Sequence, residues 1–83
     1  MKNLLSFLLV LCWFTSGYAQ DKTDLRKGIE AYKNNDPALA LEHYDSYIEN
    51  NPDDSDALYL RAIVYYEYDK YNDALSDITH AIR

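Results

Sequence analysis

Two histidines and a run of acidic residues are the side chains of this sequence whose types could do chemistry. His43 and His80 could bind a metal or transfer a proton, but neither has a companion at the spacing of a ligand pair. Residues 53–56, with the sequence DDSD, offer carboxylates for calcium but lack the glycine and distal glutamate of an EF-hand loop. We therefore expect surface histidines and a helix cap, with no metal, no cofactor and no enzymatic activity. Turnover that depends on His43 or His80 would revive the enzyme alternative.

The N-terminal segment, residues 1–19, has the layout of a secretory signal peptide. Lys2 precedes an apolar run at 4–14, and small residues follow, ending with Ala19. The run is shorter than the roughly 20 apolar residues that a transmembrane helix needs. We predict cleavage between Ala19 and Gln20 and export to a periplasmic or extracellular location, with no membrane contact after cleavage. Retention as an uncleaved anchor is the alternative.

The single cysteine, Cys12, lies inside this apolar run. A lipoprotein signal requires a small residue before the cysteine, and Leu11 is not small. Lipidation is therefore disfavoured. Cleavage at Ala19 would leave a mature chain without cysteine, and hence without a disulfide, although the exported location would allow one.

The composition favours a small helical protein. The 83 residues include eight Lys and Arg against fourteen Asp and Glu, for a formal net charge of −6. Such an acidic chain offers no basic patch for phosphate contacts, which disfavours nucleic acid as a partner. Two glycines, two prolines and 27% charged residues are typical of helical globular chains.

The spacing of apolar residues predicts about four helices. Helix breakers stand at Asp36-Pro37 and Asn51-Pro52, with a weaker one at Asp69-Lys70. Between them, apolar residues recur every three or four positions, which indicates helices over about 23–34, 37–49, 55–68 and from 71 onward. Asp36 and the DDSD run are the expected N-caps.

The sequence repeats itself at an offset of 34 residues. Comparing 21–49 with 55–83 gives five identities in 29 pairs, namely Ile29 with Ile63, Tyr32 with Tyr66, Ala40 with Ala74, Leu41 with Leu75, and Ile48 with Ile82. A fixed period of this size with two helices per unit is the signature of a stacked helical repeat.

This pattern resembles the tetratricopeptide repeat, and the resemblance covers residues 21–83. It implies an all-α, tetratricopeptide-type α-solenoid with two repeats, the first at 20–54 and the second at 55–83, incomplete at its C-terminal end. The positions that would pack the two helices of each unit closely, fill the space beside the crossing or set the turn to the next unit are Gly28, Ala40, Tyr44, Pro52, Ala62, Ala74 and Ile78. Small residues at the crossing let the two backbones approach.

Several positions depart from the family pattern. Asp24, Lys27 and Ala31 replace large apolar or aromatic residues of the first unit, and Arg61 replaces a leucine of the second. Polar residues are tolerable in the first unit because no earlier unit packs on it. The aliphatic stem of Arg61 can still cover apolar surface.

The resemblance also implies a partner groove on the concave face. Its residues would be Leu25, Ile29, Tyr32, Lys33, Tyr59, Ile63, Tyr66 and Glu67. Tyrosines favour protein interfaces, although the same residues could simply pack helix against helix. Some family members hold acidic chaperone tails with a lysine and asparagine clamp. Leu25, Ile29, Tyr59 and Ile63 stand at the clamp positions, so that partner class is disfavoured.

The sequence thus predicts an exported helical-repeat scaffold that binds a protein or peptide. The alternative is a purely structural front end of a longer solenoid whose binding site lies in repeats beyond Arg83. One preceding helix pair cannot cover all of Ala74, Leu75, Ile78, Ala81 and Ile82. Either further repeats or a partner, including self-association through this last helix, would have to cover the remainder.

Overall fold

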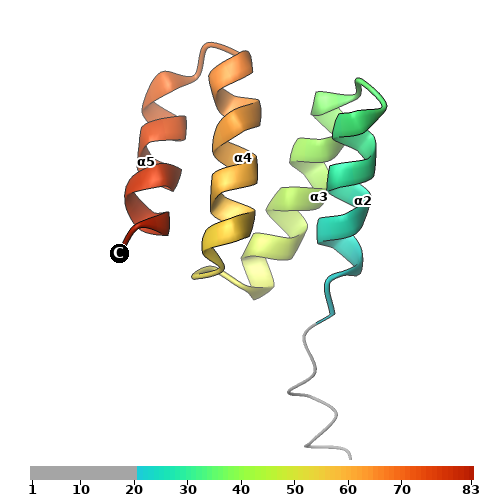
Figure 1. The fold of residues 1–83 in the computed structure, drawn as a ribbon, viewed down its shortest axis with the longest axis horizontal. Coiled ribbons are helices and arrows are strands. Elements are labelled where there is room, and N and C mark those ends of the chain that lie inside the picture. Colours follow the sequence, from blue (N-terminus) through green and yellow to red (C-terminus); the bar gives the residue numbers. More distant parts are fainter. Residues whose placement is uncertain (1–20) are drawn as a thin grey trace, which may run out of the picture.

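The computed structural model describes residues 21–83, which form four helices and no strand. They are α2 (Thr23–Lys33), α3 (Pro37–Asn50), α4 (Ser55–Glu67) and α5 (Tyr71–Ala81) (Figure 1). The predicted all-α fold and its helix boundaries are confirmed to within one or two residues. The predicted signal peptide and its cleavage site at Ala19 and Gln20 lie outside the described residues.

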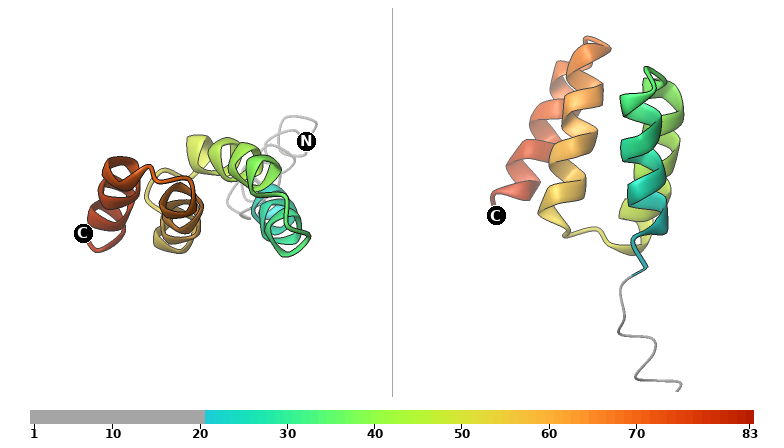
Figure 2. Two further views of the ribbon diagram at one scale, coloured as in Figure 1. Left: turned by 90° about the horizontal axis from the view of Figure 1, so that it is seen from above. Right: turned by 45° about the vertical axis from the view of Figure 1, so that its right-hand side comes forward.

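The helices form a single row in which each one packs against its neighbour in the chain. Tertiary contacts join α2 to α3, α3 to α4 and α4 to α5. Seen from above, α2 and α4 lie on one side of the row and α3 on the other (Figure 2). The first helices of the two units therefore share one face, as expected for stacked helix pairs.

Caps and prolines start the two middle helices where the sequence places them. The Asp36 carboxylate accepts a hydrogen bond from the Leu39 amide at 3.2 Å, and Pro37 occupies the first helical turn of α3. The Asp54 carboxylate accepts from the Asp56 and Ala57 amides at 3.1 and 3.3 Å, which starts α4. Pro52 lies in the exposed turn that links the two units, as predicted.

Both units use the same turn between their two helices. Asn35 and Asp69, which are 34 positions apart, have positive φ angles of 62° and 61°. After each of them, an amide reaches back to close the helix, from Asp36 to the Ala31 carbonyl at 2.9 Å and from Lys70 to the Tyr65 carbonyl at 2.8 Å. Asn and Asp tolerate this left-handed conformation better than other non-glycine residues. The repeat is therefore present in the backbone as well as in the sequence.

The core runs through the row at the helix crossings. Its buried members include the predicted small residues Ala40, Ala62 and Ala74, together with Tyr44 and Leu58. Ile48, Ala57 and Val64 belong to the same buried cluster as Tyr44 and Leu58, so one apolar core connects the two units. Ile78, the counterpart of Tyr44 in the second unit, is half-buried.

Gly28 lets α2 approach α3 closely. A Cβ atom on this glycine would lie 2.5 Å from Cδ1 of Tyr44 and 3.3 Å from the Ala40 carbonyl oxygen. The first of these distances is too short for two carbon atoms, and the Tyr44 ring that causes it is itself buried. A glycine inside a helix normally costs about 1 kcal/mol relative to alanine, so packing is the reason for its presence here.

We predict that Gly28→Ala destabilises the fold by about 1–2 kcal/mol, because overpacking outweighs the gain in helix propensity. The second unit pairs Ala62 with the smaller Ile78 at the same positions. The cost of Gly28→Ala should therefore shrink in a Tyr44→Ile background, which urea denaturation followed by circular dichroism would measure. A higher urea midpoint for Gly28→Ala alone would contradict this account.

Candidate functional site

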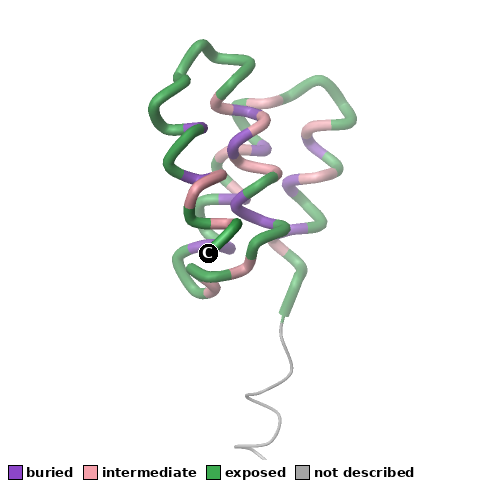
Figure 3. Tube along the Cα trace, turned by 60° about the vertical axis from the view of Figure 1, so that its left-hand side comes forward, coloured by how far each residue is buried: buried purple, intermediate pink, exposed green. Residues whose placement is uncertain are grey.

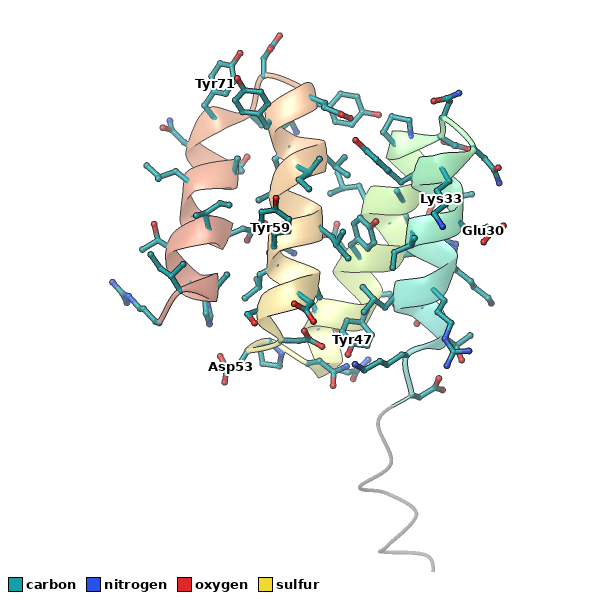
Figure 4. The ribbon with its side chains drawn as sticks, in the orientation of Figure 1. Glu30, Lys33, Tyr47, Asp53, Tyr59 and Tyr71 are labelled. Carbon is teal, nitrogen blue, oxygen red and sulfur yellow. The ribbon has the colours of Figure 1, made fainter. Side chains whose placement is uncertain are left out.

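Seven of the eight predicted groove residues lie at the surface of α2 and α4. Lys33, Tyr59, Tyr66 and Glu67 are exposed, and Ile29, Tyr32 and Ile63 are half-buried. Figure 4 shows Tyr59 in front of α4 and Lys33 in front of α2. We call this set of seven residues the α2/α4 face.

Leu25 does not belong to this face, which corrects the expectation for that residue. Only 7% of its surface is exposed, and it lies in the buried cluster with Ala31 and Tyr44. The reason is the helical spacing: Leu25, Gly28 and Ala31 are the buried residues of α2 and lie on one side of it, and Gly28 on that side meets α3. Leu25 therefore stabilises the first helix pair and offers no surface to a ligand.

A hydrogen bond connects the two helices across the α2/α4 face. The Tyr32 hydroxyl donates to the Glu67 carboxylate at 2.6 Å, from the last turn of α2 to the last turn of α4. This bond, followed by burial, raises the pKa of the Tyr32 phenol above its ordinary value. The pair fixes the orientation of Tyr32 and occupies one oxygen of Glu67.

Tyr47 holds the start of α4, the helix that carries most of the α2/α4 face. Its hydroxyl donates to the Asp54 carboxylate at 2.6 Å, the same carboxylate that caps α4. The hydrogen bond to Asp54, followed by burial, raises the pKa of Tyr47 to about 12. The bond in turn lowers the pKa of Asp54. One buried phenol thus joins the end of α3 to the N-terminus of α4.

Arg61 ties α4 to both of its neighbours. Its Nε and Nη2 atoms donate to the two oxygens of Asp77 on α5 at 2.8 and 2.7 Å, and Nη1 donates to Asp45 on α3 at 3.0 Å. Asp77 is buried, and the guanidinium carbon lies 5.6 Å from the centre of the Tyr65 ring. The hydrogen bonds to Asp77 raise the pKa of Arg61 further above its ordinary value. A planar guanidinium suits this two-sided role because it donates in several fixed directions.

The candidates for metal chemistry take structural positions. His80 contacts Asp53 at 2.9 Å and His43 contacts Asp24 at 3.5 Å, each as a single surface pair. Within residues 21–83, no three His, Cys, Asp or Glu side chains come together as a metal site would require. None of the helices in this described stretch is both long and apolar enough to cross a bilayer.

A shallow apolar hollow of about 350 Å³ lies between α4 and α5. It is lined by Ala62, Ile63, Tyr66, Glu67, Ala74 and Ile78. Three of these residues also belong to the α2/α4 face, so the hollow continues that face toward α5. Its size follows partly from Ile78, which fills less space than Tyr44 does in the first unit.

Sequence reasoning missed the two polar links that hold α4. An aspartate at position 77 falls three residues after the buried Ala74, on the side of α5 that faces α4. A carboxylate on a buried side requires a charged partner. Arg61 stands at a position where the repeat has leucine, which is the matching signal. The Tyr47–Asp54 pair had no comparable signal, because capping alone accounts for the aspartate.

Comparison with known proteins identifies the repeat. A family model described as tetratricopeptide repeat matches residues 43–76, from α3 to the first half of α5. Hsp70-Hsp90 organizing protein 1 of Arabidopsis thaliana is 40% identical over 55 residues, which is 66% of this chain and 10% of that protein. The chain thus spans about a tenth of the length of this relative. No solved structure gave a significant match.

Alkaline pH should weaken the fold through Tyr47. Its folded pKa of about 12 lies above the ordinary 10.0, so the stability it contributes is fully present below pH 10 and is lost as the pH rises toward 12. Tyr47→Phe should lower the free energy of unfolding at neutral pH by about 1–2 kcal/mol, because a hydrogen bond to a carboxylate is removed. It should also flatten the fall in stability between pH 10 and 12, as measured by urea denaturation at each pH.

The exposed Tyr68 provides the matched control, since Tyr68→Phe changes the same group without touching Asp54. If Tyr47→Phe and Tyr68→Phe lose stability in parallel between pH 10 and 12, the role assigned to the Tyr47–Asp54 bond is wrong.

Proposed function

The chain belongs to the tetratricopeptide-repeat family, and on that premise we propose that it is an exported scaffold that binds a protein or peptide partner. The proposal assigns the binding surface to the α2/α4 face. It assigns no catalytic role, no cofactor, no nucleic acid and no membrane contact to the mature chain.

One observation carries the proposal. Tyr59, Ile63 and Tyr66 recur at spacings of four and three along α4, and the two tyrosines are 54% and 65% exposed. On the opposite side of α4, Leu58 and Val64 are buried in the core. Tyr66 makes an edge-on ring contact with Tyr71 of α5 at 5.3 Å and still leaves most of its surface exposed. An exposed aromatic stripe of this kind is typical of a contact surface, because tyrosine offers a large area and a polar tip.

The chemistry of the face favours an apolar or aromatic peptide segment. Lys33 is its one basic side chain, and Glu67 is its one acidic side chain. A groove of this kind has little to attract an acidic tail, which needs several positive charges. The relative named above is named for organizing Hsp70 and Hsp90, and we include an acidic C-terminal peptide among the probes for this reason.

The structural alternative places the binding site in repeats beyond Arg83, with the described units as their front end. Under that alternative the α2/α4 face binds nothing by itself. We also propose self-association through α5, because its Leu75 and Ile82 side chains are 65% and 79% exposed.

Binding should depend on the exposed tyrosines of α4. We expect peptides selected from a displayed random library to be rich in apolar or aromatic residues. Tyr59→Ala and Tyr66→Ala should each weaken their binding by roughly tenfold, since truncating an interface tyrosine costs about 1–2 kcal/mol. Isothermal titration calorimetry would measure the dissociation constants. Tyr68→Ala, at the exposed residue that directly follows α4 and lies outside the face, should leave them unchanged.

If this chain selects no peptide but a longer form with further repeats does select one, the structural alternative is supported instead. Preferred binding of a peptide with an acidic C-terminus would contradict the partner class proposed here.

Export should yield a product that begins at Gln20. Expression from Met1 in a host with a secretory pathway should place the protein outside the cytosol, and N-terminal sequencing should read from Gln20. Ala19→Arg should block cleavage, because signal peptidase requires a small residue before the cut. Ser16→Ala, which keeps a small residue and lies further from the cut, is the control. Retention of an intact Met1 at the membrane would favour the anchor alternative.

A further inference from the structure

One side of α5 carries an apolar stripe that the described helices cover only in part. Its members are Tyr71, Leu75, Ile78 and Ile82, at successive spacings of four, three and four residues. Leu75 and Ile82 are 65% and 79% exposed. Tyr71 is 55% exposed, although its ring packs edge-on against Tyr66 of α4 at 5.3 Å, and Ile78 is half-buried beside α4. Figure 3 turns α5 toward the viewer and shows that most of its trace is exposed. We call these four residues the α5 stripe.

The first unit shows what such a stripe does when it is covered. Leu41 and Ile48 of α3 are the 34-residue counterparts of Leu75 and Ile82. Ile48 is only 7% exposed, because α4 packs on it through a cluster that includes Ala57 and Val64. The same side of α5 therefore has the chemistry of a helix–helix interface and continues an interface that already exists within the chain.

A second copy cannot cover the stripe in the head-to-tail manner in which α4 covers α3. The counterparts of Ala57, Leu60 and Val64 on α2 are Thr23, Arg26 and Glu30, and all three are exposed. Val64 is 0% exposed, so a copy docked through α2 would bury the Glu30 carboxylate at an apolar position. Burying an unpaired charge costs several kcal/mol, which excludes an open head-to-tail polymer.

A two-fold arrangement has no such conflict. The order of spacings four, three, four reads the same in both directions, so two antiparallel α5 helices place Leu75 of each copy opposite Ile78 of the other. The same register places Tyr71 opposite Ile82. A 3–4 spacing is also the one that lets two helices interdigitate along a seam. We propose that two copies of this chain pair antiparallel through the α5 stripe, as an isologous dimer.

The surroundings of the stripe fit this occupant. The hollow between α4 and α5 is lined in part by Ile78, so a side chain of the second copy beside Ile78 would enter apolar surroundings. The full sequence has a formal net charge of −6, and cleavage after Ala19 would also remove the positive Lys2, so repulsion between copies opposes pairing at low ionic strength. The affinity of the two copies for each other should therefore rise as salt screens the repulsion between them.

The oligomeric state tests the pairing. We expect the protein, expressed from Met1 and purified from the compartment it reaches, to be a monomer–dimer mixture by sedimentation equilibrium. The dissociation constant should be on the order of 100 µM, because one short helix per copy makes a small interface, and it should fall as sodium chloride is raised. Leu75→Glu and Ile82→Glu should each abolish the dimer, while circular dichroism shows that the helices persist.

Leu39 supplies the matched control. It is an exposed leucine on α3, 40% accessible and outside the α5 stripe, so Leu39→Glu should leave the dimer intact. A protein that stays monomeric at millimolar concentration would overturn the proposal. So would a dimer that survives Leu75→Glu, or an open-ended series of oligomers.

Cysteine cross-linking tests the orientation. Cleavage after Ala19 would remove Cys12, so the exported variants would each carry a single thiol. An equimolar mixture of Tyr71→Cys and Ile82→Cys should then form a mixed disulfide faster than either variant does alone, because antiparallel pairing brings these positions together. Faster bonding within each single variant would indicate parallel helices and overturn the proposed register.

This inference develops the self-association proposed above and can fail separately from partner binding. Tyr59→Ala should weaken peptide binding and leave the dimer, whereas Ile82→Glu should abolish the dimer and leave peptide binding. A dimer without any peptide affinity would refute the groove alone, and peptide binding by a strict monomer would refute the pairing alone.

Discussion

The packing of α4 against α3 is the contact on which the rest of the structure depends. Each unit by itself is two helices, and an isolated pair buries too little apolar surface to offset the entropy of ordering the chain. Ile48, Ala57 and Val64 join the two pairs into one core. Without this junction, α2 and α4 would not share one face, and the core side of α4 would be exposed.

Polar groups at the same junction give the apolar contact a single geometry. Arg61 reaches Asp45 on one side and Asp77 on the other, and the Tyr47 hydroxyl reaches the cap of α4. Apolar contacts alone allow helices to slide, whereas hydrogen bonds to charged groups are directional. A leucine at position 61 would fill space but would fix no register. The departure from the family pattern at Arg61 thus has a structural role.

Much of the fold was predictable because it rests on local rules. The caps at Asp36 and Asp54, the prolines and the apolar spacing act within a few residues of the chain, so the helices lie where the sequence predicts them. The tight position of Gly28 was predictable from the repeat. The exposure of single residues was less predictable. Leu25 was expected at the surface and is buried, because it lies on the same side of α2 as Gly28, which packs on α3.

By itself, the sequence determined the repeat, the four helices, their turns and the small residues at the crossings, since periodicity and capping depend on residues that are close together in the sequence. Only the tertiary structure decided which of those residues remain available to a partner. Ile48 and Ile82 occupy the same place in their units, yet one is 7% exposed and the other 79%. Ile48 lies inside α3 with α4 packed on it, whereas Ile82 is the cap residue at the end of α5 and no described helix packs on it. Neighbours in space are a property of the fold and not of the local sequence.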